Sequence, residues 1–383
     1  MAAQRKGSRP RLQTADLDLH PNEASDLLPL TSERLLKTRG WDTAFLTVLD
    51  EGYVENCMAV IGHRRGRGGS DDDWEIEKPR FRVDANAGKT EDAEACVSRD
   101  GWIYVIGSHY GSKSGPLEKK RAFLARFRED ALTAEPGEPS AEMEVAMNRF
   151  RLHRAVNDAL RAFGPPLLAT GPTMHERFIR NTREEAGKRA SQRILLSDVP
   201  INIEGAAFAD DGSLLLGLRF PVSAEGHPIL AEIAGVAAMI EDEQAAPVVR
   251  RFWVVDGAGT KRKPAGVRAM HRRDGDLHLI AGNLDALDKD SVLLHDHPEG
   301  GKASSGHYRL KLPRGHAGGT VPAELVQAFS RTNVEGLASD RRRQFFYVTD
   351  EDDRVHVRYM RRPASSRRGS HGRAKRPSRA KTP

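Results

Sequence analysis

Short apolar runs separated by turns recur along most of the chain, and four segments share one layout. Each begins with a short apolar stretch, continues through a turn, and ends in a second apolar run that is followed by a polar residue. An Asp-Gly pair stands at the turn in three of them, where the glycine tolerates positive φ, so the layout predicts β-hairpins. The segments are EACVSRDGWIYVIGSH from Glu94, EGAAFADDGSLLLGLR from Glu204, AGVRAMHRRDGDLHLIAGN from Ala265 and EGLASDRRRQFFYVTD from Glu335.

A fifth, degenerate copy begins at Ser32 (SERLLKTRGWDTAFLTVLDEG), and most of the hairpins are followed by two more strand-like runs. Each unit therefore has four predicted strands. Antiparallel units of this kind bury both faces by packing radially around a channel. The sequence predicts an all-β fold, a β-propeller of five or six four-stranded antiparallel blades. The last unit is one strand short, and we expect the run RLQTADLDL at residues 11–19 to complete it.

The interval between the copies at Glu94 and Glu204 is about twice one unit, so it holds either a sixth blade or an insertion. Gly164-Pro165-Pro166 interrupts it, and the periodicity around this break is helical rather than alternating. We expect two helices within residues 141–193 and favour five blades with a helical insertion. Whether the helices cover the channel is left open. The helical spacing is that of Leu152, Val156, Leu160 and Phe163, followed by the pairs Glu184 with Lys188 and Glu185 with Arg189.

The net charge of +6 is unevenly distributed. Residues 361–383 contain nine Lys or Arg and no acid, and residues 1–15 contain four and no acid, which leaves 47 of the 60 basic side chains against all 54 acidic ones elsewhere. The C-terminal stretch has no apolar residue larger than Ala, so burial cannot offset the entropy of ordering it. We predict disordered tails at residues 1–9 and 362–383 around a single domain of residues 10–361. The C-terminal tail is expected to give weak, nonspecific binding to nucleic acid.

No window approaches the eighteen consecutive apolar residues of a membrane helix, and no apolar stretch follows the basic start MAAQRKGSRPRLQT, as it would in a secretory signal. The two cysteines, Cys57 and Cys96, are too few for a disulfide framework and lack a CxxC spacing. These features predict a cytoplasmic protein with no membrane partner.

Polar residues occupy two positions of the repeat that meet at one end of a propeller channel. The first strand of a blade lines the channel and the second returns, so the start of the first and the end of the second lie on one rim. The sequence therefore predicts a charged rim that binds a small molecule or a protein. The starts carry Glu94, Glu204 and Glu335, and the ends carry Asp50, His109, Arg219, Asn283 and Asp350.

Three glutamates that face one channel do not all stay ionised without a cation between them. Three interpretations are open. Glu94, Glu204 and Glu335 bind a divalent ion, Ca²⁺ or Mg²⁺, whose preferred ligands are oxygens. Alternatively, Arg219 is the internal counter-ion, or each glutamate accepts backbone N–H groups of the next blade and only fastens the repeats. The charge of His109 changes near neutral pH, so His109 and Arg219 are the candidates for catalysis.

Three stretches carry a resemblance to a known family: NIEGAAFADDGSLLLGLRFP from Asn202, DGWIYVIGSHYGSKSG from Asp100 with RAFLARF from Arg121, and LTVLDEG from Leu46. Over most of residues 30–355 the chain resembles an uncharacterised bacterial family known as domain of unknown function 3616. The resemblance implies a propeller-like fold and a bacterial source, and it implies no activity. Tyr110 and Phe220 depart from the pattern of that family.

Two functions are compatible with these patterns. The chain contains no GxSxG elbow, no GxxxxGK phosphate loop and no complete zinc-ligand pattern, so the favoured function is a binding module whose charged rim holds a ligand or partner. The alternative is a divalent-metal-dependent hydrolase of lactones or phosphate esters. In that enzyme the three glutamates hold the ion, His109 moves protons and Arg219 orients an anionic substrate.

Overall fold

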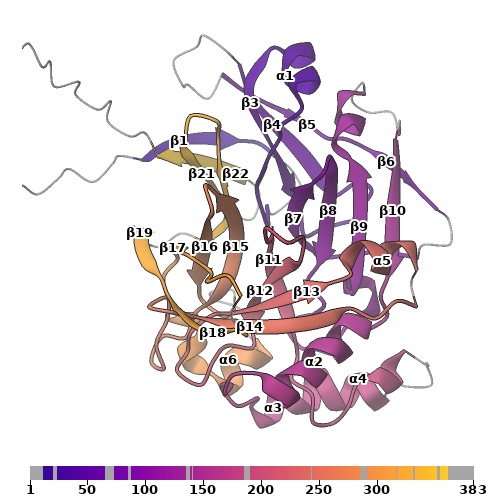
Figure 1. The fold of residues 1–383 in the computed structure, drawn as a ribbon, viewed down its shortest axis with the longest axis vertical. Helices are drawn as coiled ribbons and strands as arrows, with labels where there is room; N and C mark the ends of the chain where they lie inside the picture. The colour runs from indigo at the N-terminus through magenta and orange to yellow at the C-terminus, as the bar shows by residue number, and fades with distance from the viewer. Residues whose placement is uncertain are drawn as a thin grey trace, which may run out of the picture.

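In the described part of the chain, the strands form five separate sheets, and few helices accompany them (Figure 1). The computed structural model describes residues 12–19, 24–64, 73–84, 88–134, 139, 141–184, 190–242, 244–285, 291–315, 317–330, 333–351 and 354–360. The predicted all-β class is confirmed. The predicted tails at residues 1–9 and 362–383 lie outside the described residues.

Each sheet contains four strands of one predicted unit or three with β1, and β6 and β18 join the second and third sheets from the neighbouring units. Neighbouring strands are antiparallel except in the parallel pairs β6–β10 and β14–β18. The first sheet contains β2 (Leu28–Pro29), β3 (Trp41–Val48), β4 (Met58–Arg64) and β5 (Trp74–Glu77). The second contains β7 (Ala93–Arg99), β8 (Trp102–Gly107), β9 (Phe123–Arg128), β10 (Ala141–Met147) and β6 (Phe81–Val83). The third contains β11 (Asn202–Phe208), β12 (Leu214–Phe220), β13 (Ile229–Ala234), β14 (Val248–Asp256) and β18 (Gly319–Pro322).

The fourth sheet contains β15 (Gly266–Arg273), β16 (Asp276–Gly282), β17 (Gly306–Leu310) and β19 (Glu324–Ala328). The fifth contains β20 (Val334–Ser339), β21 (Phe345–Glu351), β22 (Arg354–Met360) and β1 (Leu12–Leu17). β1 pairs with β22 from Leu12 opposite Met360 to Leu17 opposite Val355. The prediction that the N-terminal run completes the last unit is therefore confirmed.

The first strands of the sheets contact one another. β7 contacts β2 and β11, β15 contacts β11 and β20, and β2 also contacts β20. The buried apolar side chains fill the spaces between adjacent sheets, as Ile203 and Ile106 do between the third and second. A sheet that is apolar on both faces needs a neighbour on each side, which is why the units pack face to face in a propeller-like arrangement.

The predicted hairpin turns form as expected. Asp100 and Gly101 both have positive φ (53° and 76°), and so do Asp274 and Gly275 (51° and 83°). Positive φ at both central residues is the mark of a type I′ turn, whose twist matches that of the strands it joins.

The segment that begins at Ser32 is a helix, so its interpretation as a first strand was wrong. α1 (Glu33–Arg39) starts at Ser32, whose hydroxyl accepts a hydrogen bond from the Leu35 N–H, and ends at Gly40, with φ 70°. These are the cap residues that helices favour at each end. The first strand of this sheet is instead β2, which is only two residues long and carries no Asp-Gly turn.

The predicted helical insertion begins later than residue 141, because residues 141–147 form β10. β10 completes the second sheet and leaves one insertion between it and β11. The insertion contains α2 (Arg151–Phe163), α3 (Pro172–Met174), a π-helical turn (His175–Arg180), α4 (Asn181–Glu184) and a 3₁₀ turn (Ser191–Arg193). The interval therefore holds an insertion and no sixth sheet among the described residues.

The helices of the insertion lie at one end of the molecule together with α6 (Val292–Asp296), while α1 lies at the opposite end (Figure 1). The remaining short elements are α5 (Val236–Glu241) and 3₁₀ turns at Lys119–Arg121, Glu129–Thr133 and Pro298–Gly301. In the described part of the chain, no helix combines the length and the hydropathy of a membrane span.

Candidate functional site

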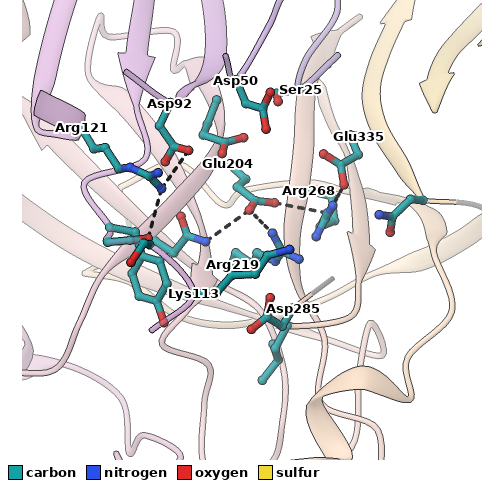
Figure 2. A pocket seen from close by; sticks show the side chains of 17 residues that line it. Ser25, Asp50, Asp92, Lys113, Arg121, Glu204, Arg219, Arg268, Asp285 and Glu335 are labelled. Atoms are coloured by element: carbon teal, nitrogen blue, oxygen red, sulfur yellow. Dashed lines mark hydrogen bonds and ion pairs between the residues drawn. The ribbon is translucent and has the colours of Figure 1, made fainter. Parts of the chain in front are cut away.

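One pocket collects most of the predicted rim residues, and its volume is about 270 Å³. A water molecule takes about 30 Å³ of liquid, so this space suits a single small molecule. Figure 2 shows charged side chains from several sheets gathered around it. The lining consists of Ser25, Asp50, Asp92, Glu94, Tyr110, Gly111, Ser112, Lys113, Arg121, Asn202, Glu204, Arg219, Arg268, Leu284, Asp285, Asn333 and Glu335.

Four lining residues come from the same position in four different sheets. Each stands at a register shift in its first strand, where regular pairing with the second strand is interrupted. A β-bulge leaves one residue outside the ladder and redirects its side chain. The repeat thus delivers one charged group per sheet to the pocket: Glu94 from β7, Glu204 from β11, Arg268 from β15 and Glu335 from β20.

A second set of lining residues follows the ends of the second strands. Asp50 comes just after β3, Tyr110 just after β8 and Asp285 just after β16, while Arg219 is the last but one residue of β12. The start of one antiparallel strand lies beside the end of the next, so both sets reach the same end of the sheets.

Arginines neutralise two of the three glutamates. Arg268 Nε lies 3.2 Å from Glu204 Oε2, and Arg268 Nη2 also pairs with Glu335. Arg219 Nη1 pairs with the other oxygen of Glu204, to which Asn202 also donates a hydrogen bond of 3.2 Å. Arg268 is only 2% exposed and joins sheets three, four and five. A buried charge of this kind persists only when it is paired.

The other side of the pocket is more acidic. Arg121 pairs with Asp92 at 3.0 Å and with Glu91 at 2.8 Å. Among the described residues, no side chain or backbone group lies within hydrogen-bonding or ion-pairing distance of the Glu94 carboxyl. Burial, together with the carboxylates of Asp92, Glu204 and Asp50, raises the pKa of Glu94 well above its usual range. Glu94 therefore keeps its proton at a pH where an ordinary glutamate has lost it.

Four lining side chains have buried polar atoms with no hydrogen-bond partner among the described residues. These atoms are Oδ1 of Asn202, the hydroxyl of Tyr110, Nε of Arg121, and Nε and Nη2 of Arg219. Asn202 is 8% exposed. An unsatisfied buried polar group costs about 1–3 kcal/mol, so a solvent molecule or ligand that satisfies it gains free energy.

The helical insertion contacts the edge of the pocket. The ring of Tyr110 stacks on Phe178, which belongs to the π-helical turn, with 4.4 Å between ring centroids. The Val292 N–H, at the start of α6, donates to the carbonyl of Lys113 at 3.1 Å. Phe178 and Leu284 belong to one apolar cluster that lies beside the pocket. The helices therefore hold one wall of the pocket in place.

The structure places Asp50, Glu94, Glu204, Arg219 and Glu335 of the predicted rim in this pocket. His109 and Asn283 are not among the residues that line it. Asn283 is buried and accepts a long hydrogen bond of 3.4 Å from Arg268. Asp350 lies in β21, and the structure does not describe its side chain.

His109 is fully buried outside the pocket lining. Its Nδ1 lies 2.7 Å from the Gly107 carbonyl, and its Nε2 contacts the Asn148 amide. Burial lowers the pKa of His109 to about 4, so the ring is neutral at physiological pH. Both ring nitrogens already have partners, and this placement gives no support to the predicted role of His109 in proton transfer.

Sequence reasoning missed Arg268, Asp92, Arg121 and Asp285. A signal for Arg268 was present: it precedes a small residue and lies six residues before an Asp-Gly turn, as Glu94 does. Because the third copy of the repeat is written from Ala265, Arg268 does not stand opposite Glu94 when the copies are compared.

The predicted metal set of Glu94, Glu204 and Glu335 has no support in the geometry. Within the described residues, no group of three or more His, Cys, Asp or Glu side chains is arranged to hold a metal ion. Arg268 and Arg219 lie where the sequence assigned Ca²⁺ or Mg²⁺. An arginine beside each of two glutamates removes the repulsion that a metal would otherwise relieve.

Comparison with known proteins bears on the fold alone. No family model matches the chain, and no curated protein is similar to it, so the resemblance to domain of unknown function 3616 stays a prediction. Among solved structures, the chain is similar to the WD40 beta propeller domain of Doa1, with 9% identity, a TM-score of 0.36, and coverage of 92% of this chain and 97% of that one.

Two enzymes are similar at the same level. The GH43 protein BlXynB from Bacillus licheniformis shares 11% identity with a TM-score of 0.38, covering 88% of this chain and 50% of that one. MPT-4, a mannose phosphorylase from Leishmania mexicana, shares 9% identity with a TM-score of 0.42, covering 92% and 88%. The chain thus spans half the length of the GH43 protein. All three TM-scores are below 0.5, so these similarities carry no argument about the activity of the chain.

Proposed function

We propose that the five sheets are the five blades of one propeller and that its pocket binds a small, neutral molecule rich in hydroxyl groups. The observation that carries this proposal is the charge balance of the lining. Six lining residues are acidic and four are basic. The arginines already have carboxylate partners in Asp92, Glu204 and Glu335. The pocket thus has no surplus of positive charge to hold a phosphate or a carboxylate.

The polar groups also favour hydroxyls over a cationic group. A hydroxyl both donates and accepts, so it satisfies carboxylate oxygens, amide groups and guanidinium N–H groups alike. Glu94, protonated, and Asn202 present both kinds of group in the same small space. An ammonium group only donates and would pair with the ionised carboxylates alone.

A binding experiment tests this proposal. Tag-free protein is mixed separately with monosaccharides and cyclitols, with sugar phosphates and citrate, and with polyamines, and binding is followed by calorimetry and thermal unfolding. We expect a neutral polyol to bind. At one hundred times its Kd it adds about 2.7 kcal/mol of stability, which raises Tm by several degrees.

Asn202→Leu keeps the size of the side chain and removes its hydrogen-bonding atoms, so it should weaken the binding at least tenfold. Gln192→Leu is the matched control, because Gln192 is an exposed amide outside the pocket lining. Binding of anions in preference to neutral polyols, or equal affinity in Asn202→Leu and wild type, contradicts the proposal.

A further inference from the structure

Glu94 differs from the other acidic groups of the pocket. Glu204 and Glu335 pair with arginines, and Asp92 pairs with Arg121. Glu94 lines the same pocket and has no such partner among the described residues. The bulge in β7 holds it there, between Ala93 and Ala95, which both pair with β8.

A carboxylic acid that keeps its proton in a pocket has a proton to give to a bound molecule within hydrogen-bonding reach, which is the role of a general acid. Burial raises the pKa of Glu94, the carboxylates of Asp92, Glu204 and Asp50 raise it further, and Arg219 lowers it. A proton donor beside other carboxyl groups is the arrangement in which two similar groups take different roles in acid–base chemistry.

An independent observation indicates that this space suits a hydrogen-bonding molecule. Asn202 is more than nine-tenths buried and lines the pocket, and its Oδ1 has no partner among the described residues. The Tyr110 hydroxyl lacks a partner in the same way. Both polar groups require a hydrogen-bonding occupant beside the acidic cluster.

We propose that Glu94 is the proton donor in cleavage of an acetal C–O bond of the hydroxylated molecule bound here. This inference rests on the proposed function. Glu94 gives its proton to the departing oxygen, which leaves as an alcohol when the C–O bond breaks. A water molecule adds its oxygen to the acetal carbon, and a neighbouring carboxylate, Asp50 or Asp92, accepts the proton that the water loses. One water is consumed, and no electrons are exchanged.

The acetal is the substrate class that this chemistry fits. Acetals resist bases and are cleaved once the departing oxygen is protonated, whereas ester cleavage begins with a nucleophile. The pocket lining contains Ser25 and Ser112 but no histidine to activate either of them. The lining therefore lacks the nucleophile and base pair of a serine esterase, and it has the protonated carboxyl that an acetal needs.

Leaving-group dependence tests the role of Glu94. The full chain and Glu94→Gln are assayed on methyl glycosides, whose alkoxide leaving group needs a proton, and on 4-nitrophenyl glycosides, whose phenolate does not. The same sugars serve as binding ligands in calorimetry. Glu225→Gln, an exposed glutamate paired with Lys261, is the control.

We expect Glu94→Gln to lose 10²- to 10⁴-fold in kcat on methyl glycosides, less than tenfold on 4-nitrophenyl glycosides, and little in sugar affinity or Tm. A purely structural role for Glu94 would lower both activities together. Wild-type protein that binds sugars and hydrolyses none of the glycosides overturns this inference and leaves the proposed function intact. Failure to bind any neutral polyol overturns the proposed function itself. Equal activity of Glu94→Gln and wild type on methyl glycosides also overturns the inference.

Discussion

Removing the charge of Arg268 is the sharpest test of how the pocket is held together. Arg268 is 2% exposed and pairs with Glu204 from one neighbouring sheet and Glu335 from the other. Two opposite charges about 4 Å apart attract each other by about 4 kcal/mol at an effective dielectric constant of about 20, and desolvation offsets part of this. Arg268→Met keeps most of the volume and leaves Glu335 buried without its cation.

We expect Arg268→Met to lower the free energy of unfolding by about 3–5 kcal/mol, because truncating one member of a buried pair strands the other. For a chain of this size the loss corresponds to a fall in Tm of about 5 °C. The double variant Arg268→Met, Glu335→Gln should recover most of it, since Glu204 keeps Arg219 as its partner. A double-mutant cycle gives the coupling energy of the pair.

Urea unfolding and calorimetry of the wild type, Arg268→Met, Glu335→Gln and the double variant supply these values. Arg341→Met is the control, because Arg341 is 62% exposed and its pair with Glu33 lies at the surface, where the change should stay within about 0.5 kcal/mol. A loss below about 1 kcal/mol for Arg268→Met, or no recovery in the double variant, would refute the view that this arginine bridges three sheets.

Two further predictions concern pH and the C-terminal tail. Burial lowers the pKa of His271 to about 3 and of His278 to about 4, and lowers that of His307, whose Nε2 lies 2.8 Å from His278 Nδ1. The unfolded chain binds protons at these histidines near pH 6.5, so their contribution to the free energy of unfolding is complete above that pH. It falls toward pH 4 by about 1 kcal/mol per pH unit for each histidine. Tm measured from pH 7.5 to 4.5 should drop less steeply in His278→Gln than in wild type, and an equal slope contradicts this. The nine basic residues of 361–383 should bind DNA weakly at 50 mM salt and not at 200 mM, which fluorescence anisotropy measures. DNA binding that survives deletion of residues 362–383 would disprove the role of the tail.

Local patterns were enough to predict most of the hairpins. The Asp-Gly turns at Asp100 and Asp274 form between strands because their glycines accept positive φ, which is a property of two adjacent residues. The segment at Ser32 shows where such reasoning failed. Its cap residues, Ser32 and Gly40, are equally local and favour a helix, and they outweighed the similarity to the other repeats.

The pocket also combines features that the sequence predicts with features that only the folded structure decides. Because Glu94, Glu204 and Glu335 hold equivalent positions in the repeat, the sequence by itself determined that they reach one end of the sheets. Which cation lies beside them depended on contacts between different sheets, and the tertiary structure places Arg268 and Arg219 beside Glu204.

His109 shows the same limit. The repeat gives its position at the end of a strand, and burial against Asn148, from beyond β10, decides that its ring is neutral and outside the pocket lining. Hydrophobic period and turn chemistry act over a few residues and can be deduced from the sequence. Charge pairing and burial act between segments far apart in the chain, so only the folded arrangement of the sheets decides them.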